Sequence, residues 1–115
     1  MLGKKYFAEI RRILDAVEET QAARMNQAAD LLADCIASGG RIFIFGCSHA
    51  AMLAEEMIYR AGGLVLMNPI FAPGLSLNER PVTRTSMLER LEGFARIIVE
   101  TSPLKKGDVL IIVST

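Results

Sequence analysis

Apolar residues recur at helical spacing through the first forty positions of the chain, in two successive stripes. The first stripe consists of Tyr6, Ile10, Ile13, Leu14 and Val17, and the second of Met25, Ala28, Ala29, Leu32 and Ile36. This spacing predicts a helical N-terminal segment over residues 1–39 and leaves open whether a break near Thr20 divides it. Gly39 and Gly40 are expected to end the segment, because glycine readily adopts the left-handed conformation found at helix C-termini.

Three short apolar runs predict β-strands at Arg41–Phe45, Leu64–Met67 and Asp108–Val113. Helical patterns separate them, one from about Ala50 to Ala61 and one from Ser86, where a capping box with Glu89 is expected, to about residue 101. Strands joined by helical crossovers run parallel. The pattern therefore predicts an α/β fold, a three-layer sandwich with a flavodoxin-like parallel sheet whose first strand lies in the middle or beside both others.

The second and third predicted strands are joined by a long connection, from Asn68 to about Arg84, which contains three prolines. Connections of this length are often functional lids. The sequence stops at Ser114-Thr115, directly after a strand buried on both faces, where open parallel sheets bind their ligands. We therefore expect residues 40–115 to form a βαβαβ unit and the whole chain to be the N-terminal part of one larger domain.

Composition narrows the function classes. With 51% hydrophobic and 23% charged residues the chain is not disordered, and 13 basic against 13 acidic residues leave no positive face for nucleic acid or an anionic membrane. The sequence contains no signal peptide and no membrane span, which predicts a cytoplasmic protein. Cys35, Cys47 and the single histidine lack metal-ligand spacing, so we expect neither a metal site nor a cofactor.

Candidate chemistry lies in the turn after the first predicted strand, Gly46-Cys47-Ser48-His49. Gly46 permits a sharp turn, Ser48 adds a hydroxyl donor, and amides at the start of the next helix would face a bound anion. The turn suits a phosphate. It lacks a G-x-G-x-x-G pattern and a Walker lysine, so an ordinary strand-to-helix turn with a serine N-cap is the alternative.

A second candidate position follows the third predicted strand. The hydroxyl groups of Ser114 and Thr115 could bind phosphate oxygens, and a frayed terminus is the alternative. If the first and third strands are neighbours, these hydroxyls and the 46–49 turn meet at one edge of the sheet.

Four stretches resemble a group of SIS (sugar isomerase) domain proteins described as phosphosugar or phosphoheptose isomerases: Gly40–Gly63, Gly74–Leu77, Leu88–Gly93 and Lys106–Ile112. Such relatives continue for about as many residues again, and Ser114-Thr115 resembles the start of their Ser-x-Ser-Gly-Arg-Asn loop. The resemblance implies binding of a phosphorylated sugar or amino sugar, with aldose–ketose isomerisation as the activity. The alternative is a non-catalytic sensor that binds the same ligands and regulates a partner.

The chain departs from the turn usual in these relatives, which resembles Gly-x-Gly-His-Ser-His. Here Ser48 stands for the second glycine, His49 matches, and Ala50 and Ala51 replace the serine and the histidine. This departure bears on catalysis more than on phosphosugar binding, because backbone amides can still act on a phosphate.

Isomerisation moves a proton between adjacent carbons through an enediol and needs a general base. Histidine is a residue type that commonly serves as a general base, which makes His49 a candidate, and Glu55, in the following helix, could face the sugar. A surface or capping histidine and a solvated helix face are the alternatives. We also expect a homodimer or a higher homo-oligomer, because the apolar stripes of residues 1–39 exceed what half a sheet can cover.

Overall fold

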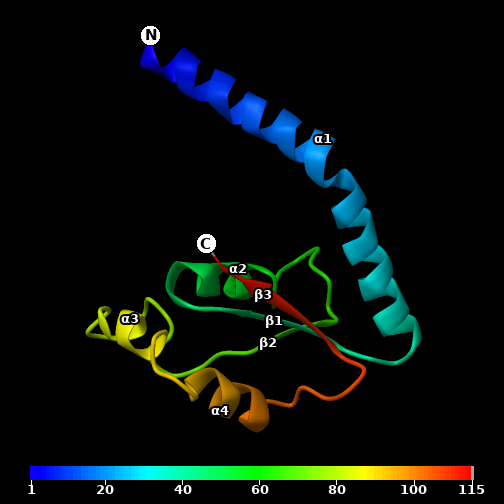
Figure 1. The fold of residues 1–115 in the computed structure, drawn as a ribbon, viewed down its shortest axis with the longest axis vertical. Helices are drawn as coiled ribbons and strands as arrows, with labels where there is room; N and C mark the ends of the chain where they lie inside the picture. The colour runs from blue at the N-terminus through cyan, green and yellow to red at the C-terminus, as the bar shows by residue number, and fades with distance from the viewer. Residues whose placement is uncertain (115) are drawn as a thin grey trace. The chain divides into compact units, whose positions relative to one another are not determined.

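In the computed structural model, which describes residues 1–114, the chain forms two compact units, Met1–Asp34 and the residues from Cys35 onward. A single helix, α1 (Leu2–Ala37), runs through the first unit without a break at Thr20 (Figure 1). No glycine or proline occurs between positions 4 and 38, so every residue there can contribute to helical hydrogen bonding. Gly39, with φ +78°, donates its N–H to the Ile36 carbonyl, which ends the helix as predicted.

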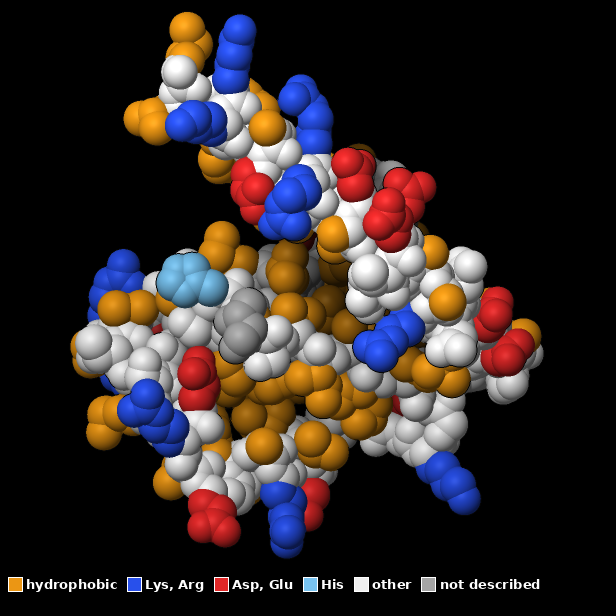
Figure 2. Space-filling model, turned by 45° about the horizontal axis from the view of Figure 1, so that its top comes forward, with side chains coloured by type: hydrophobic (Ala, Val, Ile, Leu, Met, Phe, Trp, Pro, Cys, Tyr) orange, Lys and Arg blue, Asp and Glu red, His pale blue; other side chains and the backbone are white. Residues whose placement is uncertain are grey.

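The apolar stripes of α1 are exposed within the described part of the chain. Only Cys35 is buried in this helix, and hydrophobic side chains lie along it in Figure 2. Its exposed large hydrophobic residues include Tyr6, Phe7, Ile10, Ile13, Leu14, Val17, Met25, Leu31 and Ile36. Among residues 1–114 no helix combines the length and apolar character required to cross a bilayer.

The second unit is built on a three-stranded parallel sheet with the order β2-β1-β3 (Figure 1). The strands are β1 (Ile42–Gly46), β2 (Met67–Pro69) and β3 (Val109–Val113). The parallel arrangement and the central position of the first strand confirm the predicted sheet. Because β1 and β3 are neighbours, their carboxyl ends meet at one edge.

Four short helical elements complete this unit: the 3₁₀ turn η1 (Ser48–Ala50), α2 (Ala51–Glu56), α3 (Arg84–Leu88) and α4 (Phe94–Thr101). In Figure 1, α2 and α4 lie on opposite sides of the strands. Helices on both faces of a parallel sheet form the α/β architecture that the sequence predicts.

Two predicted boundaries around β2 are wrong. The helix expected to reach Ala61 ends at Glu56, and Tyr59 has a left-handed φ of +47° that no α-helix accommodates. The strand expected at Leu64–Met67 begins only at Met67, whose N–H donates to the Leu64 carbonyl in a turn. The apolar run before β2 is therefore part of a turn.

The helix expected from Ser86 to about Thr101 is also wrong, because two helices occupy this range. Gly93, with φ +83°, separates α3 from α4. Since α3 already begins at Arg84 after Thr83, Ser86 lies inside the helix and forms no capping box. The predicted end near residue 101 is confirmed, since α4 ends at Thr101, and the hydroxyl of the next residue, Ser102, donates to the Val99 carbonyl over 2.8 Å.

The core lies on β1 and the elements that cover it. Ile42, Phe43 and Ile44 are at most 2% exposed, and Ala51 and Ala54 of α2 are buried with them. At the amino ends of the strands, the Asp108 carboxylate accepts hydrogen bonds from the Arg41 backbone N–H over 2.8 Å and the Lys105 N–H over 2.9 Å. These bonds hold β1 and β3 together at their amino ends. The candidate site lies at the opposite, carboxyl ends of the same two strands.

Candidate functional site

The candidate site begins at Gly46, the last residue of β1. A Cβ atom added there would lie 2.5 Å from the carbonyl oxygen of Ala50, so the chain folds back too closely for any side chain. The turn is closed by a hydrogen bond from the Ala50 N–H to the Cys47 carbonyl over 3.0 Å. Gly46 is therefore required for the sharp turn, as its sequence position suggests.

Ser48 has the left-handed backbone conformation, with φ +54°. Only glycine adopts this region without strain, so the serine costs stability at this turn. Its N–H donates to the Leu75 carbonyl over 2.8 Å, and neither η1 nor α2 has a side-chain cap. The alternative of a serine N-cap is therefore wrong, and the hydroxyl of Ser48 is not used as a helix cap.

A hollow of about 500 Å³ lies where the carboxyl ends of β1 and β3 meet. The register that pairs Gly46 with Val113 brings the turn and Ser114 together across the two strands. The hollow is lined by Phe45, Cys47, Ser48, His49, Ala50, Glu89, Ile112, Val113 and Ser114. We call it the β1–β3 hollow; Thr115, the other predicted phosphate ligand, lies outside the described residues.

A second hollow, of about 540 Å³, is lined by Gly46, Ala51, Glu55, Phe71, Ala72, Pro73, Leu75, Ser76 and Glu79. It lies between α2 and the connection that follows β2, and we call it the α2 hollow. Glu55 lines the α2 hollow, whereas His49 lines the β1–β3 hollow. The structure therefore does not bring the two predicted catalytic side chains into one hollow.

The long connection after β2 is packed onto the site. The Ile70 N–H donates to the Ile44 carbonyl over 2.9 Å, Leu75 is only 3% exposed, and its carbonyl holds Ser48 as described above. The Glu79 carboxylate accepts a hydrogen bond from the Gly74 N–H over 2.8 Å. These contacts make the connection a wall of the α2 hollow, and they do not favour the predicted role of a lid.

Glu89, at the C-terminal end of α3, supplies the carboxylate of the β1–β3 hollow. Burial raises the pKa of the Cys47 thiol, and the negative charge of Glu89 raises it further. The thiol is thus held in its neutral form, so Cys47 contributes no negative charge to the hollow. From the sequence, Glu89 is expected in a capping box and in a stretch that resembles SIS domain proteins, with a solvent or subunit face as the alternative. Its proximity to Cys47 depends on contacts between segments far apart in the chain.

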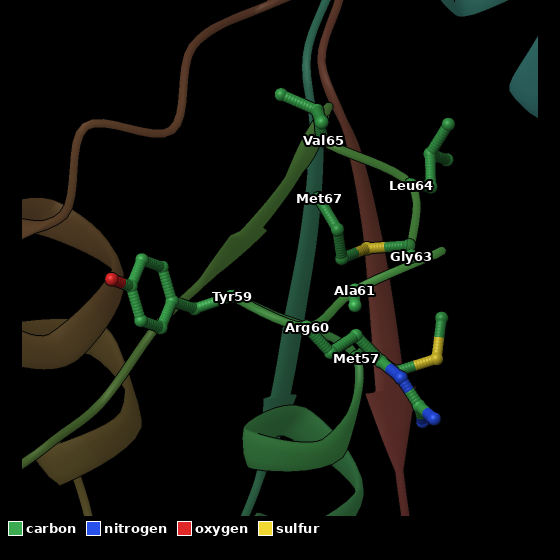
Figure 3. Close-up of a pocket in the computed structure, with 8 residues that line it drawn as sticks. All are labelled: Met57, Tyr59, Arg60, Ala61, Gly63, Leu64, Val65 and Met67. Atoms are coloured by element: carbon green, nitrogen blue, oxygen red, sulfur yellow. The ribbon is translucent and has the colours of Figure 1, made fainter.

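A third hollow, of about 420 Å³, is lined mainly by the turn between α2 and β2 (Figure 3). Its lining is mostly apolar, and the Arg60 guanidinium forms an ion pair with Glu56 on the helix surface. The Tyr59 side chain points away from the other labelled side chains and is fully exposed. This hollow contains none of the predicted site residues.

Within residues 1–114, no three His, Cys, Asp or Glu side chains are grouped closely enough to hold a metal ion. The polar groups that the β1–β3 hollow does bring together are two serine hydroxyls, an imidazole, a neutral thiol and one carboxylate. Such a set can donate hydrogen bonds to an anion and includes side chains of the types that act in proton transfer.

Comparison with known proteins places the chain in a family. Residues 5–115 match the SIS domain. A UPF0309 protein of Oceanobacillus iheyensis is 46% identical over 109 residues, which are 95% of this chain and 44% of that protein. A UPF0309 protein of Streptomyces avermitilis is 42% identical over 114 residues, 98% of this chain and 45% of the relative. The chain thus spans a little under half the length of these curated relatives. The match over nearly all of its residues, together with the parallel α/β sheet, shows that the chain belongs to the SIS domain family.

Proposed function

We propose that this chain supplies the phosphate-binding edge of a site for a phosphorylated sugar or amino sugar. The observation that carries the proposal is the β1–β3 hollow, where Ser48 and Ser114 lie at the carboxyl ends of adjacent parallel strands. Ligands of open parallel sheets bind at this edge. Membership of the SIS domain family supports the same class of ligand.

The donors available to a phosphate in this hollow are side-chain hydroxyl groups more than backbone amides. The N–H groups of Ser48 and Ala50 already donate to the carbonyls of Leu75 and Cys47, so they are engaged within the protein. A phosphate oxygen would instead accept hydrogen bonds from the Ser48 and Ser114 hydroxyls. Hydrogen bonds to a charged group contribute roughly 1.5–3 kcal/mol each, and loss of one corresponds to a tenfold or greater loss of affinity.

Calorimetric titration of the full-length protein with a panel of sugar phosphates tests the proposal. We expect Ser48→Ala to weaken binding about tenfold or more. Ser76→Ala is a matched control, because Ser76 lines the α2 hollow and should leave the affinity unchanged. An unchanged affinity in Ser48→Ala would remove this serine from the site, and no binding to the wild type would refute the ligand class.

We further propose aldose–ketose isomerisation as the activity of the full-length protein, with His49 as the general base. The imidazole would take the proton from the carbon next to the carbonyl to give an enediol and return it to the former carbonyl carbon. The hydroxyl proton would move to the former carbonyl oxygen, so that the neighbouring oxygen becomes the new carbonyl. His49→Ala should retain phosphosugar binding and lose isomerase activity. If this variant keeps its activity, His49 is not the base.

A non-catalytic phosphosugar sensor is the second candidate, and one observation favours it. Glu55 lines a different hollow from His49, so a carboxylate–imidazole pair built from these two residues is not assembled in this part of the protein. A sensor would bind sugar phosphates with the Ser48 dependence described above and would convert none of them. Product analysis after prolonged incubation with each ligand that binds would separate the two candidates.

The exposed apolar face of α1 leads us to propose that the protein forms a homodimer or higher homo-oligomer. Ile10, Ile13 and Leu14 are each between 38% and 61% exposed. Contact with the same face of a second copy would remove this area from water, and two-fold symmetry is the commonest arrangement of such contacts.

A further inference from the structure

The β1–β3 hollow combines hydroxyl donors with one acidic side chain. Of the residues that line it, Glu89 is the single carboxylate, and among the described residues no lysine or arginine side chain contributes to its wall. His49 is the single basic group there. The hollow therefore differs from a phosphate site built around a fixed positive charge.

A carboxylate beside a bound phosphate has an electrostatic cost. Like charges in one site repel each other, and this repulsion weakens binding of a neutral sugar that carries a dianionic phosphate. An ammonium group on the same ligand changes the sign of its interaction with Glu89, because the carboxylate then faces a positive charge. An uncharged hydroxyl at that position offers no such compensation.

The backbone of Glu89 is held at the C-terminal end of α3. Its N–H donates to the Thr85 carbonyl over 2.9 Å, and Thr85 is only 4% exposed. The negative charge of Glu89 also acts at Cys47, the first residue after β1, where it adds to the effect of burial in raising the thiol pKa. Its charge is therefore felt at the turn that would hold the phosphate.

We infer that Glu89 makes this site selective for a sugar phosphate that bears an ammonium group, so that an amino sugar phosphate binds better than its neutral counterpart. This inference rests on the proposed phosphosugar site at Ser48 and Ser114, and it names which of the two ligand classes the site prefers. Glu89 acts here as a specificity determinant.

The test compares three probes on the full-length protein by calorimetry: glucosamine 6-phosphate, glucose 6-phosphate and N-acetylglucosamine 6-phosphate. A buffer of about pH 6.5 keeps an amine of this kind protonated. Because Glu89 is exposed, we expect a preference of about three- to fivefold for glucosamine 6-phosphate over the two uncharged probes. The N-acetyl probe separates charge from size, since it is bulkier and carries no ammonium group.

Glu89→Gln keeps the size of the side chain and removes its charge, so the preference should fall to about one. Glu92→Gln is the matched control, because it makes the same change at an exposed residue that does not line the β1–β3 hollow. Raising the salt concentration to about 0.5 M should weaken the wild-type preference.

The outcomes separate the two proposals. If the wild type binds the three probes equally, or if its preference survives in Glu89→Gln, the inference about Glu89 is overturned while the phosphosugar site stands. If none of the probes binds and the wider panel of sugar phosphates also fails, the proposed function falls and takes the inference with it.

Discussion

Replacing Ser48 by glycine should stabilise the protein even though it removes a hydroxyl group from the proposed site. Ser48 has φ +54°, in the left-handed region where a residue with a Cβ atom is strained by about 1–2 kcal/mol. Glycine relieves this strain, although its greater freedom in the unfolded chain costs about 0.5–1 kcal/mol. The hydrogen bond from the backbone N–H to Leu75 is unaffected.

The net effect expected for Ser48→Gly is an increase of about 0.5–1 kcal/mol in the free energy of unfolding. For a domain of about 150–250 residues, a gain of 1 kcal/mol raises the melting temperature by about 2–4 °C. Urea unfolding followed by circular dichroism measures the free energy directly. Ser48→Ala is the matched control, because alanine keeps the strained backbone and should change stability by less than about 0.5 kcal/mol.

Stability and binding should respond differently in these two variants. Both lack the hydroxyl and should lose affinity for a sugar phosphate to a similar extent, while only the glycine variant gains stability. A glycine variant no more stable than the alanine variant would refute the reasoning from backbone strain.

Three further predictions follow from the fold. Gly46→Ala should destabilise the protein by about 2 kcal/mol or more in urea unfolding, because the added Cβ would meet the Ala50 carbonyl; a stability equal to wild type would contradict this close approach. Burial acts to raise the pKa of Asp108, but hydrogen bonds from Arg41 and Lys105 outweigh it, so its pKa lies below the ordinary value. The lowered pKa means that the ionised Asp108 carboxylate stabilises the folded protein. This stabilisation is present above the unfolded-state pKa of about 3.9 and is lost as pH falls through the folded pKa. Asp108→Asn should therefore be less stable than wild type at pH 7, with a difference that shrinks below about pH 4; a difference independent of pH would exclude the charge as its cause. Light scattering should show an oligomer of the wild type that Ile10→Glu weakens, and a wild-type monomer at high micromolar concentration would count against assembly through α1.

The sheet could be predicted from the sequence because its two long strands have distinctive patterns. β1 and β3 are continuous runs of β-branched and aromatic or aliphatic residues, and helical segments between the strands imply a parallel sheet. β2 could not be placed to the residue, since Leu64–Met67 is as apolar as a strand and yet forms a turn. Local hydrophobicity does not distinguish a buried strand from an apolar turn.

The candidate site was predicted only in part. The turn at Gly46–His49 and the position of Ser114 could be predicted because each lies at the end of a strand that the sequence pattern indicates well. The separation of His49 from Glu55 could not be predicted from the sequence. His49 lies in the 3₁₀ turn η1 and Glu55 in α2, and the two kinds of helix rotate successive side chains by different angles. The contribution of Glu89 depends on the tertiary contacts that bring it to the hollow beside Cys47, which no local pattern encodes.

The most direct test of the account is the affinity of the full-length protein for a sugar phosphate after the hydroxyl groups of Ser48 and Ser114 are removed singly and together. Titration calorimetry should show binding by the wild type and a loss of about tenfold or more in each single variant. Because both residues line one hollow, their losses should not be independent in the double variant. An affinity that neither substitution changes would contradict a phosphate site at the ends of β1 and β3.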